Sequence, residues 1–451
     1  MGCPAMSRAC RVLALVVVAA ALAACGGGGE QPEAAGCAGG SANCIRIGIG
    51  QPIFLGTLLS GDELAGVDAL QSVRLAIDYL DSSFDGADGT LLSHQVVVLS
   101  EDDQCGSAGG RIGAHRLLAE ADLVAVVGTT CSSAALGAAA DVLAEHDVLL
   151  ISPSNSAPAL TDPATHVRTY FRTAANDLIQ AAAVADFAAN SKGWETAVVV
   201  HTKDDAYSAQ LATAFTEAFA LNGGTNQLDL AFAVQSDGSS LDDLDGAAAR
   251  GMGPAEVLRL IAARKPDVVF LPLQQNCDTV AKLLRESPAL RGTAIIMGEL
   301  CQTRAFLASL GPLADGVYSS GPDFSDLKES IFYREWYLPA YRRQAGVAPV
   351  AVYHPAAFDA ANLVFDAIRR SAVVLPGGGL LIDREALRRA LLDVDGYEGL
   401  SGMLSCGPSG DCAESARIAI YRAPGWPVNV GERAQPVFSQ SKTLAQVRGS
   451  G

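Results

Sequence analysis

Two segments decide the fold: Leu123-Val-Ala-Val-Val127 followed by Gly128-Thr-Thr-Cys-Ser-Ser133, and Val148-Leu-Leu-Ile151 followed by Ser152-Pro-Ser-Asn-Ser-Ala157. Each begins with a short apolar run, as expected for a strand that is buried on both faces of a parallel sheet. Each then changes abruptly to hydroxyl-bearing residues. Because open α/β sheets bind ligands beyond the carboxyl ends of their strands, the two segments predict a polar binding site at one edge of a sheet.

The same alternation of short β-branched runs with longer helical patterns continues along most of the chain, which is typical of βαβ units. The expected strands are Ile45–Ile49, Val96–Leu99, Leu123–Val127, Val148–Ile151, Ala197–His201, Asp229–Ala233, Asp267–Leu271 and Ala294–Met297. The expected helices are Asp68–Leu80, Ile112–Ala119, Ala134–Glu145, Asp177–Ala189, Ala209–Leu221, Ala255–Ala263, Thr279–Arg285, Leu327–Gln344 and Pro355–Arg370. We therefore expect an α/β fold with two Rossmann-like lobes, each built on a parallel sheet.

Other stretches do not fit this alternation. Ser236–Gly253 is rich in Gly, Asp and Ser and predicts an exposed loop insertion, whereas Leu400–Ala423 predicts short strands joined by a turn. Residues 426–451 predict an irregular tail, disordered beyond Ser441. Gln51–Ser60 predicts an apolar loop after the first strand, whose large side chains either form an apolar wall for a ligand or pack on the adjoining helix; they are Phe54, Leu55 and Leu58.

Size and charge limit the classes of function. A chain of 451 residues favours two domains, and 49% hydrophobic with 18% charged residues is a globular composition. The formal net charge is −17, with 32 basic and 49 acidic residues. Because nucleic-acid binding requires clustered Lys and Arg, no nucleic-acid partner is expected.

The N-terminus has the pattern of an export signal. Arg8 and Arg11 precede the 13-residue apolar run Val12–Ala24, which is too short to span a bilayer permanently. The run ends in Leu22-Ala-Ala-Cys25, which resembles a bacterial lipobox. That resemblance implies cleavage before Cys25 and lipid attachment to it; a simple signal peptide is the alternative. Residues 1–24 are thus the expected signal peptide and residues 25–44 a lipidated, flexible tether.

The cysteines support an oxidising compartment. Of eleven cysteines, two lie in the signal peptide and one is Cys25, and the remaining eight fall in four sequence-near pairs. These pairs are Cys37 with Cys44, Cys105 with Cys131, Cys277 with Cys301, and Cys406 with Cys412. Eight cysteines allow 105 connectivities, so spacing alone does not prove the pairing. A metal site is not expected, because no CxxC occurs and the six histidines are scattered.

No catalytic signature is present in the sequence. It has no GxSxG elbow, no phosphate-binding GxxxxGK[ST] loop and no HExxH, and Gly48-Ile-Gly50 lacks the third glycine of a dinucleotide fingerprint. We therefore expect neither an enzyme nor a cofactor. The hydroxyls of Ser132 and Ser133 and the amides at a helix N-terminus suit a carboxylate, although both serines serve equally well as helix caps.

An ordered series of motifs resembles the leucine/isoleucine/valine-binding proteins, which are type I periplasmic substrate-binding proteins of ABC importers. The series comprises Glu101-Asp-Asp-Gln-Cys105, Val127–Ser133, Leu149–Thr161, Lys203-Asp-Asp-Ala-Tyr207, Lys265-Pro-Asp-Val-Val269, Ala314-Asp-Gly-Val-Tyr318 and Tyr353–Ala360. The resemblance implies two lobes joined by three crossovers near 171–174, 319–322 and 399–402. It assigns 45–172 and 321–400 to the N-terminal lobe and 173–320 and 401–425 to the other.

The resemblance also implies ligand contacts. Ser132 and Ser156 match the hydroxyls that bind an amino acid's carboxylate, and Ser154 matches a backbone contact. Tyr207 matches a tyrosine that packs on the ligand, with a core aromatic as the alternative reading. Glu299 matches the acid that binds the ammonium, but with an offset of one residue, so a solvated loop acid is the alternative.

Together these features predict a lipid-anchored, extracytoplasmic solute-binding protein. It would capture a small polar ligand, such as an amino acid or related carboxylate, by hinge closure and deliver it to an ABC permease. The alternative is a ligand-sensing receptor subunit of the same fold. The resemblance implies the Cys105–Cys131 disulfide, whereas a Cys277–Cys301 disulfide departs from the family and would brace the second lobe.

Overall fold

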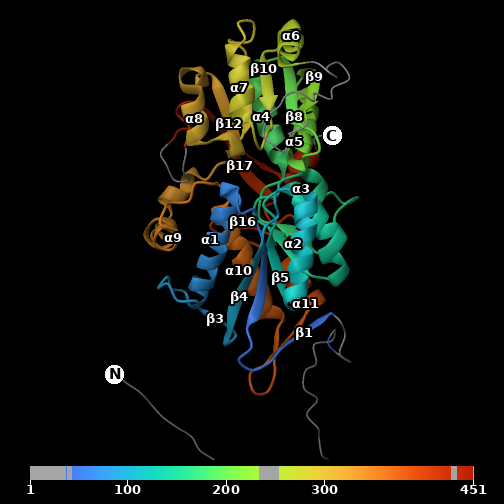
Figure 1. Ribbon diagram of the computed structural model, residues 1–451, viewed down its shortest axis with the longest axis vertical. Coiled ribbons are helices and arrows are strands. Elements are labelled where there is room, and N and C mark those ends of the chain that lie inside the picture. Colours follow the sequence, from blue (N-terminus) through green and yellow to red (C-terminus); the bar gives the residue numbers. More distant parts are fainter. Residues whose placement is uncertain (1–36, 38–42, 233–252, 428–433, 450–451) are drawn as a thin grey trace, which may run out of the picture.

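The computed structural model describes residue 37 and residues 43–232, 253–427 and 434–449. The predicted signal peptide, the lipidation site Cys25, most of the tether and nearly all of the predicted loop 236–253 lie outside the described residues. Two lobes lie one above the other along the long axis of the molecule (Figure 1). Among the described residues, no helix is both long and apolar enough to cross a membrane.

The first lobe is built on a six-stranded sheet. Its strands are β2 (Ile53–Leu58), β3 (Thr90–Leu91), β4 (His94–Glu101), β5 (Ala125–Gly128), β6 (Leu149–Ser152) and β7 (Tyr170–Arg172). The order is β3-β4-β2-β5-β6-β7, with every pair parallel except β3 with β4. The helices are α1 (Leu64–Asp78), α2 (Ser107–Glu120), α3 (Ser132–Ala135) continuing as helical turns to His146, α9 (Leu338–Ala345), α10 (His354–Ser371) and α11 (Arg384–Leu392).

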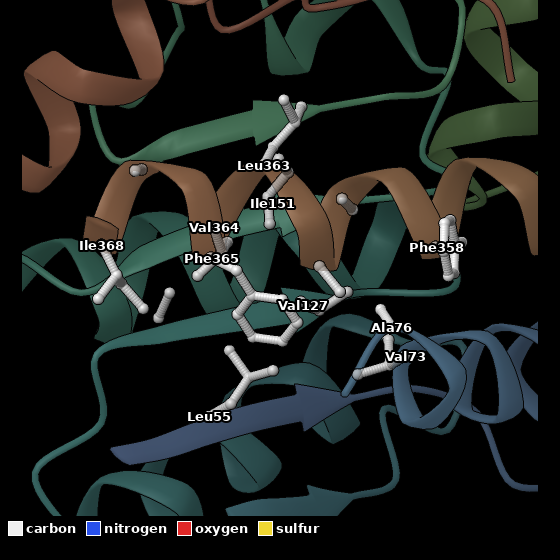
Figure 2. Packing of buried hydrophobic residues seen from close by; sticks show 14 of the residues in the cluster. Leu55, Val73, Ala76, Val127, Ile151, Phe358, Leu363, Val364, Phe365 and Ile368 are labelled. Atoms are coloured by element: carbon white, nitrogen blue, oxygen red, sulfur yellow. The ribbon is translucent and has the colours of Figure 1, made fainter. Parts of the chain in front are cut away.

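The core of the first lobe lies between the sheet and the helices α1 and α10. Phe365 of α10 lies toward Val127 of β5 and Leu55 of β2, and Phe358 lies near Ala76 of α1 (Figure 2). Phe365, Val127 and Ile151 have at most 1% of their surface exposed. Continuous apolar runs form these strands because both faces of a parallel sheet are covered.

The second lobe is built on a seven-stranded sheet. Its strands are β8 (Thr196–Thr202), β9 (Thr225–Phe232), β10 (Val268–Leu271), β11 (Ala294–Gly298), β12 (Val317–Pro322), β17 (Ser415–Arg422) and β18 (Phe438–Thr443). The order is β18-β17-β12-β11-β10-β8-β9, with β17 and β18 antiparallel. The helices are α4 (Asp177–Asp186), α5 (Ala206–Leu221), α6 (Pro254–Arg264), α7 (Cys277–Glu286), α8 (Arg304–Leu310) and α12 (Leu444–Arg448).

Two small antiparallel sheets complete the fold. One has the order β1-β14-β13 and consists of β1 (Cys44–Ile47), β13 (Val373–Val374) and β14 (Leu380–Asp383). The other pairs β15 (Tyr397–Glu398) with β16 (Met403–Leu404). All but the first of the expected strands coincide with parallel strands of the two large sheets, and each expected helix overlaps observed helical turns.

The prediction for the first strand was wrong. The run expected to be the first parallel strand, Ile45–Ile49, overlaps β1, which pairs antiparallel with β14 at the far end of the lobe (Figure 1). The central strand is instead β2, inside the predicted apolar loop Gln51–Ser60. Leu55 and Leu58 are buried in the core, so these side chains pack inside the lobe, as one of the two alternatives predicted. They do not line the cavity between the lobes, so the apolar ligand wall predicted by the other alternative is wrong.

Two boundaries also differ from the prediction. The third passage between lobes lies beyond the expected 399–402, because Cys406, Cys412 and Ala413 still pack in the core of the first lobe. The irregular tail predicted for 426–451 is wrong where the structure describes it. Strand β18 pairs with β17, because the edge of the sheet offers unpaired backbone N–H and C=O groups. Leu444 of α12 is buried against α4.

Candidate ligand-binding site

A cavity of about 180 Å³ lies between the two lobes. A cavity of about 150 Å³ suffices for one benzene molecule, so this volume suits a small ligand. The first lobe lines it with Glu63–Ala65, Cys105, Thr130–Ser132, Ser154, Ser156 and Val350–Tyr353. The remaining lining residues are Tyr207, Gln274, Glu299, Leu300, Gln302, Thr303, Gly321, Pro322, Phe324, Ser325, Tyr421 and Pro427.

Ser132 is the first residue of α3, shortly after β5, and Ser154 and Ser156 lie on the loop after the neighbouring strand β6. The Oγ of Ser132 accepts a hydrogen bond from the backbone N–H of Ala157 at 3.3 Å. The Oγ of Ser154 donates to the carbonyl of Thr130 at 2.8 Å. The Oγ of Ser156 is buried and lies beside the Asp177 carboxylate, whose pKa it lowers, without completing a hydrogen bond to it.

The capping alternative for the two serines after β5 does not hold. The N-cap of α3 is Cys131, and it makes no side-chain capping bond. Ser133 does not line the cavity: its Oγ accepts from the backbone N–H of Ala206 at 2.9 Å and lies 3.5 Å from Oδ2 of Asp205. Ser133 thus joins the first lobe to the start of α5, and its predicted ligand contact is corrected to an interlobe contact.

Tyr207 lies in the first turn of α5, where the carboxylate of Asp205 caps the helix by accepting from Ser208 N–H at 2.7 Å. The Tyr207 hydroxyl is buried beside Glu299, whose pKa it lowers, without completing a hydrogen bond to it. Burial and the nearby charge of Glu299 raise the pKa of Tyr207 well above the usual value. Gly298 allows this placement, because a Cβ there would collide with the Tyr207 hydroxyl.

Glu299 follows β11 directly and is 6% exposed, so the alternative of a solvated loop acid does not apply. Its Oε1 accepts from the Tyr353 hydroxyl at 2.6 Å and its Oε2 from Gln180 Nε2 at 3.0 Å. Burial raises the pKa of Glu299, and the hydrogen bonds lower it only in part. Gly321 leaves room for this side chain, because any Cβ there would collide with it.

Asp177 is a residue that sequence reasoning missed. It is the first residue of α4, is 1% exposed, and neither carboxylate oxygen has a hydrogen-bond partner among the described residues. Burial and the charge of Glu299 raise its pKa well above the usual value. Gln180 lies one turn further along α4, so one face of this helix contributes to the acidic side of the site. The only sequence signal was an acid at a helix start, which ordinary helices also show.

The lobes contact each other across the cleft near the cavity. Besides the Tyr353–Glu299 bond, Gln275 Nε2 donates to Oε1 of Glu63 at 3.0 Å. The backbone N–H of Ala159 donates to Oε1 of Gln210 at 2.8 Å. These bonds hold the two lobes together around the cavity.

All four predicted disulfides are present: Cys37–Cys44, Cys105–Cys131, Cys277–Cys301 and Cys406–Cys412. Cys105 and Cys131 line the cavity on the first lobe. Cys301 is two residues from Glu299 and ties it to the start of α7. Within the described part of the chain, no three His, Cys, Asp or Glu side chains gather as a metal site would require.

A family model described as periplasmic binding protein matches residues 54–416. The chain belongs to this family. Family membership implies an extracytoplasmic location and a solute-binding role, as predicted, and not an enzymatic one. No curated protein matches the sequence.

Solved periplasmic binding proteins share the fold. A leucine-binding protein of Thermotoga maritima is 18% identical with a TM-score of 0.66, over 82% of this chain and 96% of its own. A branched-chain amino acid transporter substrate-binding protein of Streptococcus pneumoniae, in complex with isoleucine, is 18% identical with a TM-score of 0.64, over 87% and 99%. A solute-binding protein of R. palustris, in complex with 4-hydroxybenzoate, is 16% identical with a TM-score of 0.66, over 86% and 97%. At such identities the likeness shows the type I periplasmic binding protein fold, in agreement with the predicted two-lobed architecture.

Proposed function

We propose that this protein is a lipid-anchored, extracytoplasmic receptor that encloses an α-amino acid between its lobes and delivers it to an ABC importer. The observation that carries the proposal is the set of buried polar groups around the cavity. Ser156 and Tyr207 have buried hydroxyls that complete no hydrogen bond among the described residues. Asp177 and Glu299 are buried carboxylates whose pKa values stay raised, although the charge of Arg172 lowers that of Asp177 in part.

The charge of the site favours a ligand with an ammonium group. Among the described lining residues there is no Lys, Arg or His, while Glu299 lies in the wall and Asp177 close behind it. Buried carboxylates are costly unless a positive group pairs with them. A ligand ammonium beside Glu299 and Asp177 would offset that cost. It would also lower the pKa values of both carboxyl groups, which are raised without it.

The first-lobe wall of the cavity suits a carboxylate, because the hydroxyl-bearing residues Thr130, Ser132 and Ser154 line it there. Apolar side chains such as Leu64, Leu300 and Val352 form much of the remaining wall. A zwitterion with an apolar side chain therefore matches the site better than the simple aromatic acids bound by some structural neighbours.

A thermal-shift screen of the purified protein tests the ligand class. L-Leucine, L-isoleucine and L-phenylalanine are compared with benzoate and 4-hydroxybenzoate, each over a wide concentration range. At 100 times the dissociation constant a ligand should add about 2.7 kcal/mol, which corresponds to a rise of several degrees in Tm. A shift with the benzoates alone would refute the amino-acid proposal.

The anchor is tested separately. Cys25→Ser should release the protein from cell membranes into the soluble fraction, because a lipid chain supplies about 0.8 kcal/mol of membrane affinity per buried CH₂ group. Membrane association unchanged in this variant would contradict lipid attachment at Cys25.

A further inference from the structure

Arg172, the last residue of β7, is fully buried and donates hydrogen bonds from all three guanidinium nitrogens. Its Nε donates to Oδ1 of Asp411 at 2.7 Å, a residue that is also fully buried. Its Nη2 donates to the Thr161 hydroxyl at 2.6 Å. Asp411 balances the charge, so the remaining N–H groups are available to organise the backbone nearby.

The N–H groups of Arg172 Nη1 bind the loop that carries Ser156. Arg172 Nη1 donates to the carbonyl oxygen of Asn155 at 3.2 Å and to that of Ala157 at 2.9 Å. These two residues flank Ser156, whose hydroxyl lies unpartnered at the cavity wall. The carbonyl of Ser156 itself accepts from the backbone N–H of Asp177 at 2.9 Å. The direction of the Ser156 side chain is therefore set by bonds to the backbone on both sides of it.

We propose that Arg172 is a positioning residue for ligand binding: it fixes Ser156 at the cavity wall by holding the carbonyls before and after it. Arg172 does not line the cavity and acts on the wall through the loop at Ser156; its charge also lowers the pKa of Asp177 in part, and Arg172→Lys keeps that charge. The consequence for affinity rests on the proposed function, whereas the positioning of the loop does not.

Arginine is specifically required for this task. Its planar fork presents several N–H donors at fixed angles, whereas a lysine ammonium is a single compact donor centre that cannot reach Asp411, Thr161 and both carbonyls together. The side chain of Asn155 fixes the earlier part of the loop through Thr129, with Nδ2 donating to the Thr129 carbonyl at 3.0 Å. Arg172 thus acts on the later part, from 155 to 161.

Hydrogen–deuterium exchange without ligand is the first test. Arg172→Lys should speed exchange of the amides from 154 to 161 while the protein stays folded, because local opening becomes easier. If this variant does not fold, Arg172→Met with Asp411→Leu removes both buried charges and should show the same faster exchange. The control is Arg285→Lys, since Arg285 is 4% exposed and bonds the carbonyls of Arg291 and Thr293 away from the cavity. Unchanged exchange from 154 to 161 would overturn the proposal.

A double-mutant cycle of Arg172 and Ser156, measured as affinity for L-leucine, is the second test. Arg172→Lys should weaken binding about tenfold in the wild-type background but not in the Ser156→Ala background, because the two residues act as one unit. Equal weakening in both backgrounds would show a purely structural role and overturn the proposal. If the wild type binds no L-leucine, the proposed function fails, and the exchange result still decides the role of Arg172.

Discussion

The hydroxyl of Tyr353 donates to Oε1 of Glu299 at 2.6 Å, and the two residues belong to opposite lobes. Tyr353 directly precedes α10 in the first lobe, whereas Glu299 follows β11 in the second. The buried acid of the site is thus stabilised by a group from the other lobe. Contact between the lobes and the electrostatics of the site are therefore coupled.

Removing that hydroxyl should weaken binding. Tyr353→Phe is expected to lower affinity for an L-amino acid about tenfold or more, because hydrogen bonds to charged groups contribute about 1.5–3 kcal/mol. Isothermal titration calorimetry measures the change. Tyr318→Phe serves as the control, since its ring packs in the core of the second lobe. An unchanged affinity in Tyr353→Phe would show that the interlobe bond does not contribute.

Replacing Asp177 should make the protein more stable but weaken ligand binding. Asp177→Asn removes a buried charge whose oxygens have no partners, so the ligand-free protein should become more stable to urea by about 1 kcal/mol or more. Binding of an L-amino acid should weaken markedly if the proposed ammonium site is correct, because one of the two acids near that position is neutralised. A variant that is less stable yet binds normally would place Asp177 outside the site's electrostatics.

The side chain of Asp359 should contribute more to the stability of the ligand-free protein at pH 5 than at pH 7.5. Burial raises the pKa of Asp359 to about 6, above the ordinary value of about 3.9 in the unfolded chain. Its contribution to the free energy of unfolding therefore falls as pH rises from about 4 to about 6 and levels off above. Urea unfolding of the wild type and of Asp359→Asn at both pH values measures this contribution, and the opposite effect of His354, whose pKa burial lowers to about 4, is common to both proteins. The stability of the wild type relative to the variant should fall from pH 5 to pH 7.5, and a pH-independent difference would contradict the prediction.

The second-lobe disulfide should hold Glu299 in place. Replacing Cys277 and Cys301 by Ser opens a loop whose closure contributes about 3–4 kcal/mol by the chain-entropy estimate. Both stability and ligand affinity should fall, because Cys301 is two residues from Glu299. The matched control replaces Cys37 and Cys44, which lie at the far end of the first lobe, and should leave affinity unchanged. Equal affinity in both double variants would limit the Cys277–Cys301 bond to stability.

Much of the fold follows from local pattern, but the choice of central strand does not. Cys44–Ile47 and Ile53–Leu58 are both short apolar runs, and either can serve as a buried strand. Only the pairing partners distinguish them: β2 inserts between β4 and β5, whereas β1 pairs with β14, far away in sequence. Strand β18 is similarly hidden, because the sequence Phe-Ser-Gln-Ser-Lys-Thr is polar, as an exposed edge strand often is.

The cavity lining, too, could be predicted from the sequence only in part. Ser132, Ser154, Ser156, Tyr207 and Glu299 were predicted and all line the cavity. Asp177 and Tyr353 were not assigned, because each comes from a helix start whose neighbours across the cleft are set only by tertiary packing. Ser133 was assigned to the ligand but turns toward α5, since successive residues at a helix start point in different directions.

Calorimetric titration of L-leucine into the wild type and into Glu299→Gln at pH 7.5 tests the central claim most directly. The wild type should bind L-leucine and not benzoate. The variant should lose at least about a hundredfold in affinity, because a buried charge pair broken on one side costs about 3–5 kcal/mol. Equal affinity of wild type and variant for L-leucine, or binding of benzoate alone, would contradict an ammonium-binding site at Glu299.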